Sequence, residues 1–259
     1  MIPSYTSQLH AGVGLVDETF LLLELWQPGM SGSDVAELVL QSGRLPMMSA
    51  RRIRNLVAEC FVPRYVQHDG LIASRLKKLK DIVSYNEMEQ LLFIYTCRVH
   101  TILRDFVADV YWNAYISGRT SLSNEDAQQF VVRANQEGKT STPWSEGTVV
   151  RVARYLTASC ADFGLLERGT KRERKILPYR IDPHVAVVLT YDLHFAHLGD
   201  NAIVNHQDWA LFGLEPLDVI EELKRLSLRG DFIVQHAGGM VHIGWKWKTM
   251  DEVINAIAQ

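Results

Sequence analysis

Apolar residues recur every three or four positions along most of the chain, and glycine, proline or short polar runs separate the periodic segments. This spacing is typical of helices that bury one face. It predicts helices at residues 16–26, 34–41, 49–61, 71–83, 87–117, 123–137, 142–160, 183–198 and 216–227, a short one from residue 205 and a last one from residue 249. The segment 87–117 fits one long helix or two abutting ones. The predicted fold class is therefore mainly α.

Two segments depart from helical spacing and predict small β-hairpins. Residues 163–181 contain a short apolar run, a charged loop from Glu167 to Lys175 (the basic loop) and a second apolar run. Residues 231–247 contain two alternating runs around Gly238-Gly239, where a type I′ turn requires positive φ. Each hairpin follows a helix, and the order helix, strand, loop, strand is that of a recognition helix and its wing. We therefore predict a winged-helix region in the C-terminal half.

The helix from Thr142 and the basic loop after it contain residues suited to contact phosphates. The helix from Thr142 should bury an apolar face and expose Gly147, Arg151, Arg154 and Ala158, so that its backbone can approach a duplex closely. From Arg168 to Lys175 the basic loop adds five cations against one acid, Glu173: Arg168, Lys171, Arg172, Arg174 and Lys175. The alternative is a solvated surface helix followed by an ordinary charged hairpin.

The N-terminal helices form a second candidate helix-turn-helix. Ser33 and Ser49 are the predicted caps of its second and third helices. The outward residues of the third helix and of the next one are basic: Arg51, Arg52, Arg54, Arg75, Lys77 and Lys78. Many trihelical units bind nothing, so DNA contact here is one of two open alternatives. The expected division is a helix-turn-helix-like unit (1–70), a helical core (71–140) and a winged-helix-like region (141–259), with residues 138–141 as linker.

Basic and acidic residues are concentrated in different segments of the chain, although the net charge is only −3. Residues 44–80 hold nine basic and two acidic side chains, and residues 144–175 hold seven and four. Residues 1–43 have five acids and no Lys or Arg, and residues 176–259 have eleven acids against six cations. Any attraction to nucleic acid must therefore come from the two local basic islands.

The remaining features argue against other classes of protein. Cys60, Cys97 and Cys160 are widely spaced in apolar helical segments, which fits reduced thiols in a cytoplasmic protein. No signal peptide is evident and no apolar stretch is long enough to span a membrane, so no membrane partner is expected. Phosphate-binding, dinucleotide-binding and nucleophile-elbow motifs are absent from the sequence, and we expect no cofactor and no catalytic residues.

One polar cluster keeps a metal-dependent hydrolase among the alternatives. The segment from residue 191 to residue 209 concentrates residues of metal-ligand type: Asp192, His194, His197, Asp200, His206 and Asp208. The spacing matches no known ligand motif, because His194 and His197 are three residues apart and not four. Polar residues around a helix end explain the cluster more simply, so we predict no metal site.

The chain resembles the BrxA family of the bacteriophage-exclusion (BREX) defence systems. Four stretches carry the resemblance: YTSQLHAGVGLVDETFLLLELWQPGMS, SARRIRNLVAECF, LLFIYTCRVHTILRDFVADVYWNAYISG, and the helix with Trp144 and Thr148 that leads to Gly164-Leu165-Leu166. The resemblance covers most of residues 5–181, and the segment after Ile181 extends beyond typical members. It implies a small, non-enzymatic, helix-rich protein with helix-turn-helix character that binds double-stranded DNA in a phage-defence locus. The resemblance also implies a role in DNA contact for five arginines: Arg51, Arg52, Arg54, Arg151 and Arg154.

The sequence therefore predicts a DNA-binding protein without catalysis, with other phage-defence proteins as further partners. Contacts should be mostly to the duplex backbone, because the exposed faces offer arginines and few Asn or Gln base readers. The main alternative is a protein-interaction adaptor that binds no nucleic acid. Its docking surface would be the second winged-helix outline, where Asp218, Glu221 and Glu222 repel phosphate and the turn carries no cations.

Overall fold

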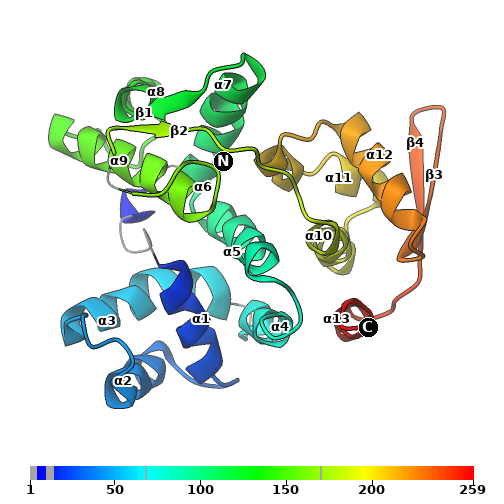
Figure 1. The fold of residues 1–259 in the computed structure, drawn as a ribbon, viewed down its shortest axis with the longest axis horizontal. Coiled ribbons are helices and arrows are strands. Elements are labelled where there is room, and N and C mark those ends of the chain that lie inside the picture. Colours follow the sequence, from blue (N-terminus) through cyan, green and yellow to red (C-terminus); the bar gives the residue numbers. More distant parts are fainter. Residues whose placement is uncertain (1–4, 10–14, 68, 170) are drawn as a thin grey trace. The chain divides into compact units, whose positions relative to one another are not determined.

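The computed structural model describes residues 5–9, 15–67, 69–169 and 171–259 (Figure 1). The chain is mainly helical and carries small antiparallel β-hairpins. It divides into two compact units. The first unit combines Met1–Lys77 with Leu92–Tyr179, and the second combines Lys78–Leu91 with Arg180–Gln259. The expected boundaries after residues 70 and 140 both fall inside the first unit.

The first unit begins with short helices that pack on one another: α1 (Val16–Leu25), α2 (Gly32–Ser42) and α3 (Ala50–Leu56), which continues as the π-helical η2 (Val57–Val66). Ser49 caps α3 as predicted, since its hydroxyl accepts the Arg52 N–H. The predicted cap of α2 is wrong. Ser31 caps this helix, because it places Asp34 three residues on, where serine and aspartate satisfy each other's backbone N–H groups.

A row of helices follows: α4 (Leu71–Leu79), α5 (Tyr85–Val99), α6 (Thr101–Phe106), η3 (Val107–Tyr111) and α7 (Trp112–Ile116). The alternative of two abutting helices is the correct one for residues 87–117, because His100 leaves helical geometry between α5 and α6. Phe93, Phe106 and Tyr111 are fully buried in the core of the first unit. The apolar spacing of residues 71–83 places Leu71 on the core side of this helix, but Leu71 is 49% exposed at the start of α4.

The last part of the first unit contains β1 (Ser121–Ser123), α8 (Asn124–Gln136), α9 (Glu146–Asp162) and β2 (Glu173–Lys175). Strands β1 and β2 pair antiparallel, with Leu122 opposite Arg174. Residues 165–167 pair antiparallel with residues 175–177 through backbone hydrogen bonds and a bridge between Leu166 and Ile176. The basic loop thus connects two antiparallel segments, as predicted, and β1 is an additional strand.

Two local predictions in this region are wrong. Helix α9 does not begin at Thr142, because Ser145 caps it by accepting the Thr148 N–H. The predicted linker at residues 138–141 is not a free connection. The Tyr5 N–H donates to the Lys139 carbonyl over 2.7 Å, and the Ser141 N–H donates to the Tyr5 carbonyl over 3.0 Å. The sequence also favours an extended start at residues 1–14, and most of this segment lies outside the described residues.

The second unit contains α10 (Pro183–Phe195), α11 (Asp200–Val204), the 3₁₀ helix η4 (Gln207–Phe212) and α12 (Pro216–Ser227), followed by β3 (Phe232–Ala237), β4 (Met240–Trp245) and α13 (Met250–Ile257). The predicted hairpin is confirmed in its register, from Phe232 opposite Trp245 to Ala237 opposite Met240. Gly238 and Gly239 have φ of 60° and 77°, as a type I′ turn requires.

Candidate nucleic-acid interface

Helix α9 presents the face that its sequence predicts. Val152, Leu156 and Cys160 are buried, whereas Arg151 and Arg154 are exposed. Gly147 is also exposed, and Ala158 is half-buried. Within the described part of the chain neither arginine is ion-paired; Arg151 makes a long 3.5 Å hydrogen bond to the Thr148 hydroxyl. The helix therefore carries two positive charges that remain available to a ligand.

The cations of the basic loop are mostly engaged within the first unit. Lys171 pairs with Glu167 at 2.8 Å. Arg172 pairs with Glu125 of α8. Arg168 donates to the Asp162 carbonyl over 3.2 Å, and Lys175 is exposed. All four side chains are nevertheless exposed to solvent. The Arg172 side chain, for example, is 82% exposed.

The prediction that Arg174 is an exposed cation is wrong. It is 7% exposed and lies opposite Leu122 in the β1–β2 pair, where its Nη1 donates to the Glu167 carbonyl over 3.1 Å. Strand residues alternate between two faces, so Glu173 and Lys175 point outward and Arg174 points into the core. A phosphate cannot reach a side chain in this position.

Asn124, at the start of α8, connects the basic loop to α9. Its N–H donates to the Arg172 carbonyl over 2.9 Å, and its side-chain oxygen accepts the Thr157 hydroxyl over 2.7 Å. Sequence reasoning missed this residue. The sequence contains one signal near Asn124, the capping box of Ser123 and Asp126, which marks the start of α8. This signal does not show that Asn124 contacts Arg172 and Thr157.

Carboxylates beside these cations are held in their charged form. The hydrogen bond from Arg172 lowers the pKa of Glu125, and the hydrogen bond from Lys171 lowers the pKa of Glu167. Inside the unit, burial raises the pKa of the Cys160 thiol well above its usual range. The cysteine is therefore a packing residue, whereas the two glutamates act as counter-ions of the basic loop.

The N-terminal island is smaller than predicted. Arg51, Arg52 and Arg54 are exposed on α3. Lys77 differs from the prediction, since its ammonium donates to the backbone carbonyls of Glu24 at 2.9 Å and Trp26 at 2.6 Å.

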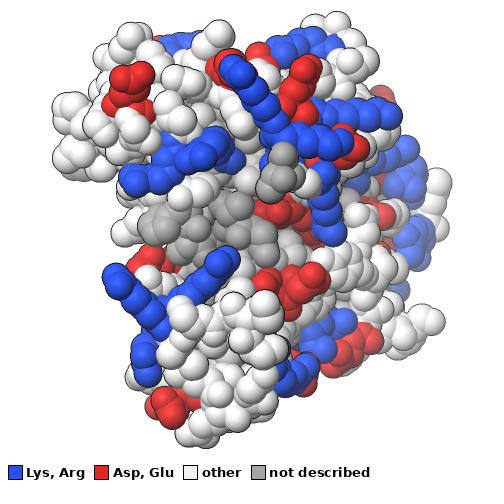
Figure 2. Space-filling view, turned by 60° about the vertical axis from the view of Figure 1, so that its left-hand side comes forward, with Lys and Arg blue, Asp and Glu red and all other residues white. Residues whose placement is uncertain are grey.

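The remaining cations of that island are also less available than expected. Within the second unit, Lys78 pairs with Asp251 at 2.7 Å, and both side chains are more than half exposed. Arg75 is half-buried. Figure 2, which brings forward the side where α3 and α9 lie, shows Lys and Arg side chains in an upper and a lower group with acidic side chains among them.

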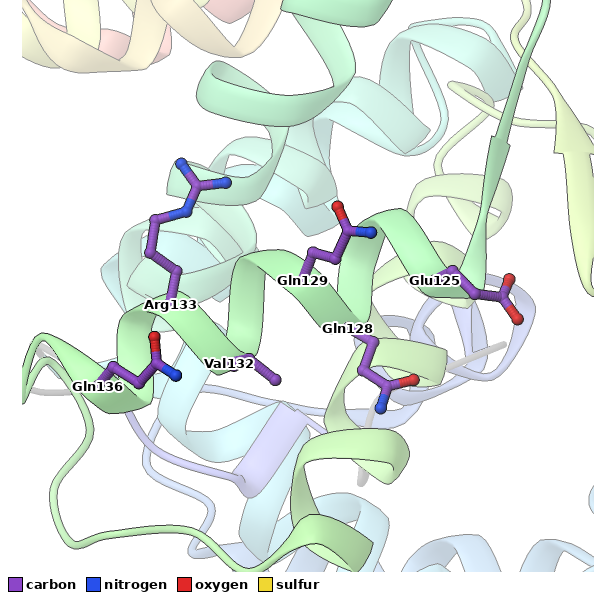
Figure 3. Close-up of a pocket in the computed structure, with 6 residues that line it drawn as sticks. All are labelled: Glu125, Gln128, Gln129, Val132, Arg133 and Gln136. Carbon is purple, nitrogen blue, oxygen red and sulfur yellow. The ribbon is translucent and has the colours of Figure 1, made fainter.

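A shallow groove of about 500 Å³ runs along α8 and is lined by Glu125, Gln128, Gln129, Val132, Arg133 and Gln136. All of these residues belong to one helix, and their side chains diverge: Figure 3 shows Gln129 and Arg133 on one side of α8 and Gln128 on the other. Side chains that diverge do not assemble a catalytic set, which needs groups within hydrogen-bond reach of one another.

The predicted polar cluster of the second unit is engaged in structural contacts. The Asp200 carboxylate accepts the Ile243 N–H over 2.9 Å, and His206 accepts the Asp208 N–H over 3.3 Å at the start of η4. His194 stacks on Trp245 with ring centroids 3.8 Å apart. Across the described ranges, no group of three or more His, Cys, Asp or Glu residues is placed to hold a metal ion. This geometry gives no support to the metal-dependent hydrolase alternative.

Together, the fold and these surfaces define a mainly helical protein with small antiparallel hairpins and with exposed arginines on α3 and α9, among other helices. The BrxA family model matches residues 3–191. The chain therefore belongs to the BrxA family of BREX systems, which supports a role in phage defence. The match extends ten residues beyond Ile181, where the resemblance noted in the sequence ends.

The crystal structure of an uncharacterized protein from Magnetospirillum magneticum is similar over 74% of this chain and 95% of its own chain, with a TM-score of 0.56 and 15% identity. A likeness at this identity shows the fold alone. The comparison with curated proteins found no match. In the part of the chain that the structure describes, no helix is both long and apolar enough to cross a membrane.

Proposed function

We propose that this BREX protein is a non-enzymatic protein that binds double-stranded DNA. The proposed contact is made by α9 and the basic loop, and α3 adds a second contact. The observation that carries the proposal is the exposure of Arg151 and Arg154 on α9, directly before a loop with four exposed or partly exposed cations. Helices with free arginines beside a basic loop suit the phosphate backbone of a duplex.

The order of elements supports a winged helix in the first unit. A helical segment (α6 to α7) precedes β1, which is followed by α8, α9, a strand at residues 165–167, the basic loop and β2. In a winged helix the last helix before the hairpin is the recognition helix, and the loop between the hairpin strands is the wing. In this interpretation α9 enters a groove and the basic loop lies on the adjacent backbone.

The N-terminal helices support a helix-turn-helix interpretation of α2 and α3. The two helices pack on each other, and α3 exposes Arg51, Arg52 and Arg54. Within the described residues neither Arg51 nor Arg54 is ion-paired. Burial raises the pKa of the Glu18 carboxyl, and the charge of the nearby Arg52 acts in the opposite direction, so Arg52 already has an acidic neighbour. We propose α3 as a weaker second contact.

Binding should be dominated by phosphates and should show weak sequence preference. The exposed face of α9 has arginines, a glycine and a threonine but no Asn or Gln, which are the side chains that read adenine. Because the net charge of the chain is −3, attraction depends on these local charges and is screened by salt.

An adaptor role is the second candidate, and one observation favours it. The second unit exposes large apolar side chains on α12 and the β3–β4 hairpin: Leu217 (68%), Leu228 (88%), Ile233 (66%) and Met240 (70%). Contiguous exposed apolar patches mark protein-binding surfaces, and we propose that these four side chains contribute to such a patch. Other phage-defence proteins are the proposed partners of this surface.

The test is binding of a labelled duplex of about 30–40 base pairs across a series from about 50 to about 200 mM salt. Arg151→Ala/Arg154→Ala should weaken binding at least about tenfold at the lowest salt and make the log–log salt slope shallower by roughly 1.8, since two phosphate contacts are lost. Lys224→Ala/Arg225→Ala on α12 removes the same charge and should leave binding unchanged. Absence of wild-type binding at low salt would overturn the DNA proposal and favour the adaptor.

A further inference from the structure

The basic loop reaches solvent with its charges partly neutralised. Two of its exposed cations are held by carboxylates of the same unit, Lys171 by Glu167 and Arg172 by Glu125. Glu167 lies four residues before Lys171 in the same segment. Glu125 instead comes from α8 and is 47 residues away from Arg172 in sequence. The Glu125–Arg172 pair therefore depends on the tertiary fold.

The geometry of this pair resembles the contact that arginine makes with phosphate. Arg172 donates from both Nε and Nη2 to the same oxygen of Glu125, Oε1, with Nε 2.6 Å from it. The backbone is fixed at the same point, because the Asn124 N–H donates to the Arg172 carbonyl. A carboxylate oxygen that accepts two guanidinium donors occupies the position that a phosphate oxygen would take.

We propose that Glu125 is an internal competitor of DNA for Arg172, and that it limits the affinity of the basic loop for a duplex. The inference rests on the proposed DNA-binding function. For the loop to contact a phosphate with Arg172, the ion pair with Glu125 must open, and the free energy of this pair is lost from the free energy of binding. The pair is exposed, so it opens readily and weakens binding without abolishing it.

The central experiment is a double-mutant cycle of Glu125→Gln and Arg172→Ala, measured by duplex binding across the salt series. Glu125→Gln keeps the size of the side chain and removes its charge. It should tighten binding about fivefold at low salt and steepen the log–log slope by about 0.9, because Arg172 gains one full phosphate contact. In the Arg172→Ala background, Glu125→Gln should change binding less than about twofold. Thermal unfolding of each variant checks that the fold is retained.

A matched control separates this competition from a general change of charge. Glu137 lies just after α8, is similarly exposed, and pairs with Lys139 at 2.8 Å. Glu137→Gln changes the net charge by the same amount away from the basic loop, and it should leave affinity unchanged. The proposal is overturned if both glutamine variants tighten binding equally, or if the Glu125→Gln gain persists without Arg172. It also fails, while DNA binding stands, if wild type and Glu125→Gln bind alike. If neither binds at low salt, both proposals fail.

Discussion

The strands that follow α9 and the strands that follow α12 are held in place by different kinds of contact. Strand β2 pairs with β1, some fifty residues earlier in the chain, and it is anchored by the buried Arg174. Strands β3 and β4 pair with each other across a two-glycine turn. The first hairpin thus depends on long-range tertiary contacts, whereas the second depends on local turn geometry.

The two regions also differ in the charge of the helix that precedes them. Helix α9 exposes Arg151 and Arg154, whereas α12 exposes Asp218 and Glu221. The cation Arg225 on α12 is held by Glu222, which is 7% exposed. The same order of elements therefore supports two proposals, a nucleic-acid contact in the first unit and a protein contact in the second, because function depends on the side chains that the elements carry.

The largest expected effect tests the long-range anchoring of β2. Arg174→Ala should lower the free energy of unfolding by about 1–3 kcal/mol, because it removes a buried side chain and leaves the Glu167 carbonyl without its donor. The measurement is urea unfolding followed by circular dichroism. Lys175→Ala on the exposed face of the same strand is the control and should stay within about 0.5 kcal/mol of wild type. Equal losses in the two variants would mean that burial of Arg174 does not anchor the strand.

A smaller effect tests the local turn of the second hairpin. Gly238 has φ of 60°, and a Cβ at this position would meet no atom within 4 Å. The cost of Gly238→Ala is therefore conformational and should be about 1 kcal/mol. Gly238→Asn should cost less, since asparagine adopts positive φ more readily. If alanine and asparagine destabilise the protein equally in urea unfolding, the turn conformation is not what holds the β3–β4 hairpin.

Local signals in the sequence predicted the second region well. The alternation around Gly238-Gly239 gave the strands and their register, and Pro216 gave the start of α12. Both signals arise within a few residues of the structure that they determine. The face of α9 was predicted for the same reason, because helical periodicity alone separates Arg151 and Arg154 from the buried side.

The contacts that shape the candidate site could not be predicted in this way. Strand β1 is three residues long and lies before a strong helix start, so its periodicity is too short to detect. Without β1, the inward face of β2 is unknown, and Arg174 looks like one more exposed cation. The engagement of Lys77 with the Trp26 carbonyl and of Arg172 with Glu125 likewise depends on residues distant in sequence. Charge is visible in the sequence, but its availability is decided by tertiary structure.

The smallest expected effect is a pH dependence of stability that arises in the second unit and not around α9 and the basic loop. The segment between His100 and His184, which includes α9 and the basic loop, contains no histidine. His194 of α10 stacks on Trp245 of β4, and burial lowers its pKa below the ordinary value, while Asp200 acts in the opposite direction. Protonation therefore favours the unfolded chain. The stability that neutral His194 contributes is present above a pH of about 6.5 and is lost as the pH falls below it.

Melting temperatures at about pH 7.5 and about pH 5.5 measure this dependence. His194→Phe keeps an aromatic ring against Trp245 and removes the titrating group, so the decrease in melting temperature on acidification should be smaller in the variant than in wild type. An equal decrease in the two proteins would show that other groups cause the acid sensitivity. In that case the packing of α10 against the hairpin would tolerate a charged imidazole, and the two regions would differ in surface charge and anchoring but not in their response to pH.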